Sequence, residues 1–274
     1  MPNICKNFTA NIKLFINMNI ELFQPLLVAI FISAAASLLG CFAILKRMAL
    51  VGDALSHVAL PGIAFGLIFN FNPFLGAIVF LAMAVIGIWI LEYKSKLSVE
   101  TIVGVFFTAS LALGTLITPK HELIEALLGN IAALSLKESI ISVILSIGLI
   151  VSLLLIHKKL ALNMISQEMS QSAGIKNKRL EFAYLLIFAL AVALGIRFVG
   201  ALLMGSLVII PAASAKNISR SLYSFMSLSV IFGIFSAALG IYISSIYGMA
   251  PGPIFILIGS MIFITSLIIR RFKF

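Results

Sequence analysis

Runs of about twenty apolar residues recur along the whole chain, separated by short polar segments. A helix of that length spans the hydrocarbon core of a bilayer, which is about 30 Å thick. Hydrophobic residues make up 62% of the 274 residues and charged residues only 10%, too few polar groups to cover a soluble domain of this size. The sequence therefore predicts an all-α fold, a polytopic transmembrane helical bundle, with residues 1–19 as an N-terminal tail and 20–274 as one membrane domain.

Hydropathy and turn signals divide the chain into nine predicted spans, although counts of eight or ten also fit the pattern. The segment 121–136 is too short and too polar at its start to span by itself, which favours a re-entrant or interfacial helix. The predicted spans are 20–45, 52–69, 74–92, 99–118, 137–156, 179–196, 198–215, 222–246 and 253–270.

Basic residues gather at alternate ends of these spans, and 14 of the 19 Lys and Arg residues fall on one side. The positive-inside rule makes that side cytoplasmic, which puts the C-terminus inside and, with nine spans, the N-terminus outside. The net charge of +10 does not indicate nucleic-acid binding, because the cations follow the span ends and form no single patch.

One apolar stretch combines a carboxylate with an imidazole. Asp53, the only Asp in the chain, precedes His57 by four residues, so a helix would place both on one face. These groups suit Zn²⁺ and are acceptable for Mn²⁺ or Fe²⁺, and polar groups inside a membrane suggest function because they are costly there. Two ligands are too few for a closed site, but a two-fold homodimer would present four. The alternatives are an Asp–His hydrogen bond that serves packing, or a pair facing lipid headgroups.

Pro61 follows this pair by one helical turn. Because proline has no N–H, the carbonyl of His57 loses its helical partner, which predicts a kink beside the pair. The freed carbonyl could face a cavity or accept a hydrogen bond from Ser56 or water; a kink that serves only packing is the alternative.

The longest polar connection on the predicted cytoplasmic side is 157–178. Apolar residues at 162, 165, 169 and 173 repeat at helical spacing, and Gly174 is suited to end the helix. A short amphipathic helix at 163–174 could dock into the groove of a soluble partner, or lie on the lipid surface.

Three polar residues on the predicted outer side, His121, Glu122 and Glu125, could attract a cation before it enters, although a solvated charged loop is the commoner explanation. The chain has no Gly-x-x-x-x-Gly-Lys-Ser/Thr phosphate loop, so it should not hydrolyse ATP itself. No catalytic set emerges, and the chain is not predicted to be an enzyme.

The stretch Gly52–Gly62 resembles the signature of the membrane permeases of ATP-binding-cassette (ABC) importers for zinc, manganese and iron. Weaker matches to the same family are 198–203, continuing into 207–215, and 250–253. The resemblance covers nearly the whole chain from residue 20 onward. The last third also resembles cobalamin and siderophore permeases, which implies a related helical architecture.

The resemblance implies a permease subunit that carries a divalent transition metal, zinc before manganese or iron, as cargo and not as a resident cofactor. Two permease copies in the plasma (inner) membrane of a prokaryote would form the path. A separate cytoplasmic ATPase would use the ATP, and an extracytoplasmic solute-binding protein would deliver the metal. Asp53 and His57 would contact the metal inside the membrane. The residues expected to couple to the ATPase are Ile165, Glu168, Met169, Ala173 and Gly174.

A different class of function remains open from the residues alone, an ion-coupled secondary transporter or an integral membrane enzyme. Such a transporter would usually show internal repeats with discontinuous helices at matching positions, and no clear repeat is evident. An enzyme would need further convergent polar groups at one depth, and the sequence does not offer them.

Overall fold

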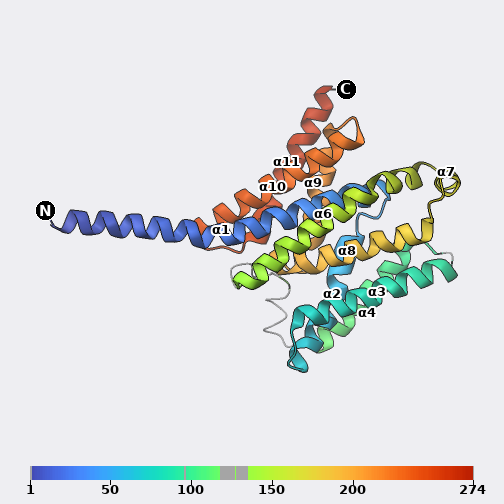
Figure 1. Ribbon diagram of the computed structural model, residues 1–274, viewed down its shortest axis with the longest axis horizontal. Helices are drawn as coiled ribbons and strands as arrows, with labels where there is room; N and C mark the ends of the chain where they lie inside the picture. Colours follow the sequence, from blue (N-terminus) through green and yellow to red (C-terminus); the bar gives the residue numbers. More distant parts are fainter. Residues whose placement is uncertain (1, 96, 118–126, 128–134, 274) are drawn as a thin grey trace.

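The structure is a computed structural model, and every regular element in its described residues is an α-helix (Figure 1). It describes the backbone of residues 2–95, 97–117, 127 and 135–273, and within those ranges the side chains of residues 23–271 apart from residue 198. In chain order the helices are α1 (Pro2–Leu45), α2 (Val51–Ile68), α3 (Pro73–Ser95), α4 (Val99–Ile117), α6 (Leu136–Ile165), α7 (Gln167–Ser172), α8 (Asn177–Val199), α9 (Met204–Ile218), α10 (Leu222–Tyr247) and α11 (Pro251–Lys273).

Eight of the described helices are long and apolar enough to cross a membrane, which confirms the predicted helical membrane fold. They are α1, α2, α3, α4, α6, α8, α10 and α11. Most of the predicted segment 121–136 lies outside the described residues.

The predicted span at 198–215 is wrong in its bounds. Helix α8 continues to Val199, Gly200 then turns with φ +84°, and α9 begins only at Met204. With 15 residues, α9 is about 22 Å long, short of a bilayer core. The prediction put the break at Arg197, the charged residue of this stretch, whereas α8 continues past it and ends where the positive φ of Gly200 stops the helix without any polar residue.

Helix α2 lies inside the bundle, where it packs against α3, α4, α8 and α9. Two-thirds of its spanning window is buried, so its polar side chains face protein rather than lipid. Glycines allow the close approach: a Cβ added at Gly62 would collide with the backbone of Gly76 on α3.

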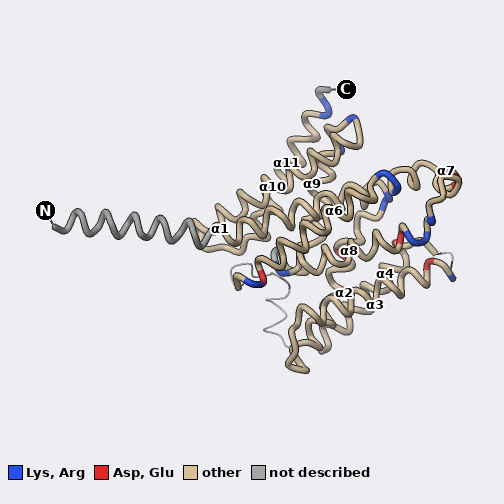
Figure 2. Tube along the Cα trace, in the orientation of Figure 1, with Lys and Arg blue, Asp and Glu red and all other residues tan. Residues whose placement is uncertain are grey.

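Most Lys and Arg residues of the described chain lie at one end of the bundle, the end that carries α7 (Figure 2). Helices α1, α6 and α9 finish there, since Leu45, Ala161 and Lys216 line one cavity. The end of α11 is tied to the same place, because Arg270 donates a hydrogen bond to Asn217. We call this the basic end of the bundle.

Candidate metal site

The two predicted ligands lie on α2, which is helical from Val51 through Pro61 to Ile68. The structure therefore confirms the helix that the four-residue spacing of Asp53 and His57 requires, and it puts both side chains on one face. Pro61 packs beside Gly114 of α4. The kink at Pro61 stays a prediction.

Neither member of the pair is satisfied by the protein. The His57 side chain is 8% exposed, and its Nδ1 atom has no hydrogen-bond partner among the described residues. Its ring meets the ring of Phe107 edge-on, with the centroids 5.2 Å apart. The half-buried Asp53 carboxylate likewise has no hydrogen bond or ion pair within the described chain. Buried polar groups are normally paired, so these two are available for a ligand.

One chain does not complete a metal site in its described part. No group of three or more His, Cys, Asp or Glu side chains comes together there. Since Zn²⁺ normally takes four ligands, a lasting site would need groups from elsewhere.

The fully buried hydroxyl of Ser56 ties α2 to the turn that precedes α9. Its Oγ lies 2.6 Å from the carbonyl oxygen of Asp53 and 2.6 Å from that of Ala201. The single hydroxyl proton serves one of these acceptors at a time. The sequence suggested instead that Ser56 could serve the freed carbonyl of His57, and the structure shows no such bond among the described residues.

The first turn of α9 lies directly against Asp53, which sequence reasoning missed. A Cβ added at Gly205 would lie 2.6 Å from the Cβ of Asp53 and 2.8 Å from its Cα, closer than side chains approach one another. Only a glycine at 205 allows this contact. The signal in the sequence, a glycine near the start of an apolar run, is too common to have singled it out.

The contacts of the pair with α8 and α9 show how far along those helices it lies. Asp53 follows Arg47 by only six residues, which pointed to a position near the basic end. Gly205, its neighbour, is 13 residues before the end of α9, and Phe188, which lies next to Gly52, is 11 residues into α8. At 1.5 Å per residue, the pair lies beside α8 and α9 about 17–20 Å along each helix from its basic end.

Known proteins resemble this chain over most of its length. The family model described as the ABC 3 transport family matches residues 19–270. The chain belongs to that family. Its relatives include the high-affinity zinc uptake system membrane protein ZnuB of Haemophilus influenzae, 32% identical over 91% of this chain and 98% of ZnuB. The manganese transport system membrane protein MntC of Halalkalibacterium halodurans is 33% identical over 88% of this chain and 84% of MntC.

A solved structure supports the fold of this ABC 3 family member. PsaBC from Streptococcus pneumoniae in complex with Fab contains a chain that superposes with a TM-score of 0.81 at 29% identity, covering 93% of this chain and 95% of that one. The predicted family and the predicted architecture of an ABC importer permease are therefore confirmed.

The amphipathic pattern predicted one helix at 163–174, but the structure divides this segment between two helices. Helix α6 ends at Ile165, and Ser166 takes an extended backbone and caps the separate six-residue helix α7 through Met169 N. Gly174 comes directly after the C-cap residue Ala173 and has φ +75°, a backbone that favours glycine. A capping serine therefore interrupts a periodic apolar pattern.

Several predicted coupling residues are exposed at the basic end. Ile165 is 79% and Met169 58% exposed, and Glu168, Ala173 and Gly174 are exposed too. The buried Ser170 hydroxyl holds α7 in place through a 2.8 Å hydrogen bond to Asn177 at the start of α8. The other predicted polar set, His121, Glu122 and Glu125, lies outside the described residues.

Proposed function

We propose that this chain is the permease subunit of an ABC importer that moves a divalent transition metal into the cytoplasm. The observation that carries the proposal is the unsatisfied Asp53–His57 pair on a helix buried inside the bundle. Polar groups at that depth are costly, and a carboxylate beside an imidazole is a ligand set for such metals. Two relatives at 32–33% identity, one a zinc and one a manganese transport protein, support the same cargo.

The pair would act as half of a transient site. A second permease copy related by a two-fold axis would supply another Asp53 and His57, and the metal would be released as the two copies rearrange. Two ligands per chain suit this role, because a cargo site must let go of its ion. The outer residues His121, Glu122 and Glu125 would attract the cation before it enters.

The exposed residues of segment 163–174 would couple the permease to a separate cytoplasmic ATPase. Ile165 and Met169 present apolar surface, and Glu168 adds a charge, at the basic end that the positive-inside rule assigns to the cytoplasm. The C-terminus would lie on that side in the plasma membrane of a prokaryote. An extracytoplasmic solute-binding protein would deliver the metal on the other side.

Zinc is our first choice of cargo, with manganese next and iron third. A His–carboxylate set binds Zn²⁺ more tightly than Mn²⁺ in the Irving–Williams order, although metal supply and the binding protein can reverse the preference.

The test is uptake of radioactive zinc and manganese by cells lacking this gene and carrying Asp53→Asn, His57→Ala or both changes. We expect uptake of the physiological metal to fall at least ten-fold in each variant at equal membrane abundance. Gly148→Ala is the matched control, because a Cβ there meets nothing within 4 Å. Normal uptake of both metals by the double variant would remove the site assignment.

A further inference from the structure

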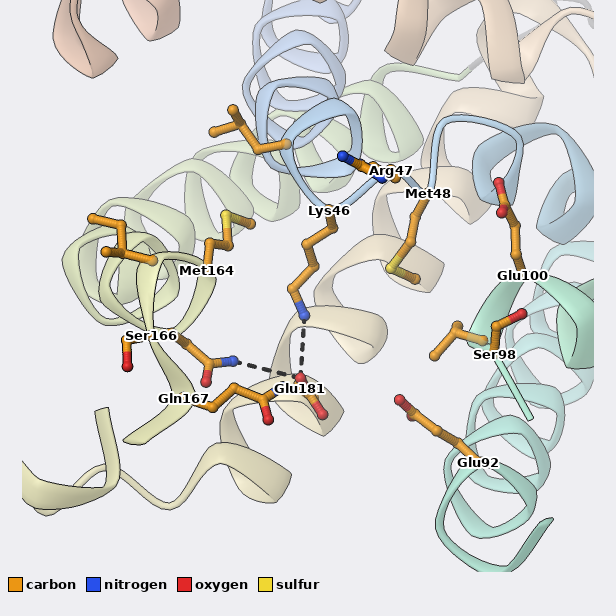
Figure 3. Close-up of a pocket in the computed structure, with 14 residues that line it drawn as sticks. Lys46, Arg47, Met48, Glu92, Ser98, Glu100, Met164, Ser166, Gln167 and Glu181 are labelled. Atoms are coloured by element: carbon orange, nitrogen blue, oxygen red, sulfur yellow. Dashed lines mark hydrogen bonds and ion pairs between the residues drawn. The ribbon is translucent and has the colours of Figure 1, made fainter. Parts of the chain in front are cut away.

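A cavity of about 590 Å³ opens at the basic end, between the start of α2 and the coupling segment (Figure 3). It is lined by the α1–α2 turn, the end of α3, the start of α4, the junction of α6 with α7, and α8. Met48 lines it and accepts the hydrogen bond from the backbone of Val51, the first residue of α2. Asp53 is in the first turn of the same helix, so a cation released toward the basic end would have this cavity close by.

Carboxylates are concentrated in this cavity although the chain carries a net charge of +10. Three of the nine acidic residues line it, namely Glu92, Glu100 and Glu181. Figure 3 shows Glu92 and Glu181 directed toward one another across the space, while Glu100 points away from them. Glu92 has no hydrogen bond or ion pair within the described chain. Two ionised carboxylates that face each other repel, and a cation between them or beside them relieves the repulsion.

A buried amide oxygen adds a third potential ligand. The Asn163 side chain is 5% exposed, and its Nδ2 donates a hydrogen bond to Glu181 Oε1 at 3.4 Å. Its Oδ1 atom has no partner in the described residues. An unsatisfied buried carbonyl is costly, and binding a cation would satisfy it. Carboxylate and amide oxygens together suit hard divalent cations such as Mn²⁺.

The resident cation is the ammonium group of Lys46, whose Nζ lies 3.6 Å from Glu181 Oε1. The same ammonium lies 5.3 Å from the centre of the Tyr184 ring, so it has a second partner when Glu181 is taken by another cation. Arg47 also lines the cavity but forms no ion pair with these carboxylates among the described contacts. Because Lys46 competes with a metal for Glu181, it keeps the site weak. Lys46 pairs with Glu181 again once the metal has left.

We propose that Glu92, Glu181 and the Asn163 oxygen form a transient divalent-cation site at the cytoplasmic exit, with Lys46 as the competing counter-ion. This site extends the proposed function, and the identity of its cargo rests on that proposal. The site is separate from the Asp53–His57 pair. An ion that leaves the pair would be held here by oxygen ligands and then displaced by Lys46. Because the site has no imidazole or thiolate, it binds Zn²⁺ more weakly than the pair would.

The test measures Mn²⁺ binding to the purified permease–ATPase complex by electron paramagnetic resonance. The Asp53→Asn/His57→Ala background removes the membrane pair, and we expect one weakly bound Mn²⁺ per permease chain to remain. Glu181→Gln or Glu92→Gln should weaken that binding at least ten-fold. Lys46→Met should tighten it about ten-fold, a gain that misfolding cannot imitate. Glu100→Gln, in the same cavity but directed away, should leave it unchanged.

The proposal is overturned if Lys46→Met leaves the affinity unchanged or lowers it, or if Glu181→Gln binds Mn²⁺ as its background does. These outcomes do not depend on whether the Asp53–His57 pair carries metal. Uptake lost in the pair variants with no effect of the cavity variants on binding would leave the proposed function standing and remove the exit site. Normal uptake in the pair variants, together with the expected binding changes, would leave the exit site standing and remove the Asp53–His57 site assignment.

Discussion

Replacing Gly205 by alanine tests whether the contact between α9 and Asp53 sets the geometry of the candidate metal site. The new Cβ would lie 2.6 Å from the Cβ of Asp53, whereas carbon atoms in contact are normally about 3.5–4.0 Å apart. The two helices must therefore separate by about 1 Å. The 2.6 Å hydrogen bond from Ser56 to Ala201 joins the same two segments, and that shift would stretch it beyond bonding distance.

We expect Gly205→Ala to lower the free energy of unfolding by about 1–3 kcal/mol, the usual cost of overpacking a core. Metal uptake should fall at least ten-fold at equal membrane abundance, because a site displaced by about 1 Å loses its geometry. Uptake in a strain lacking the gene and chemical denaturation of the purified protein would measure the two effects.

Gly104→Ala is the matched control, since a Cβ there meets nothing within 4 Å on a helix that also packs against α2. It should leave both uptake and stability close to those of the parent. If Gly205→Ala takes up metal normally and unfolds like Gly104→Ala, the contact between α9 and Asp53 does not position the site, and the reasoning fails.

Three further substitutions probe the contacts around this core. Ser56→Ala leaves the buried carbonyl of Ala201 without its donor, so the free energy of unfolding should fall by about 1–3 kcal/mol. Amide exchange across residues 200–204 should become faster as the turn loosens. Unchanged exchange would exclude a role for this bond in holding the turn. Arg197→Gln breaks a 2.6 Å ion pair with Glu138, but both side chains are about a third exposed, so a melting experiment should show a loss of no more than about 1 kcal/mol, shrinking with salt. Ser170→Ala frees α7 from α8; transport per ATP hydrolysed should drop in reconstituted complex, and an unchanged ratio would argue against a coupling role.

The helical membrane fold could be predicted because each spanning helix leaves a long apolar run that no soluble fold needs. The exact position of a break could not, since α8 runs past the charged Arg197 and ends at Gly200 through its backbone angle. Ser166 was also hidden, because a serine inside an already polar connection gives no sign that it caps a helix.

The candidate site was predicted only in part, because the sequence reveals local spacing but not contacts between distant segments. The spacing of Asp53 and His57 is local, so a helix alone brings the two together. One contact of that helix, the bond from Ser56 to Ala201, joins residues 145 positions apart, and a single sequence carries no record of such pairings. The contacts of the pair with α8 and α9 could not be predicted for the same reason.

The abrupt start of α9 has an electrostatic consequence for the carboxylate it touches. Asp53 lies in the first turn of its own helix, α2, and the first turn of α9 packs against it. Neither helix has a side-chain cap at that end, since the N-cap residues are Leu50 and Leu203. The positive ends of two helix dipoles therefore converge on one carboxylate, and each can stabilise a partly buried anion by up to about 2 kcal/mol. The field of these two dipoles repels an arriving cation and shortens its stay beside Asp53.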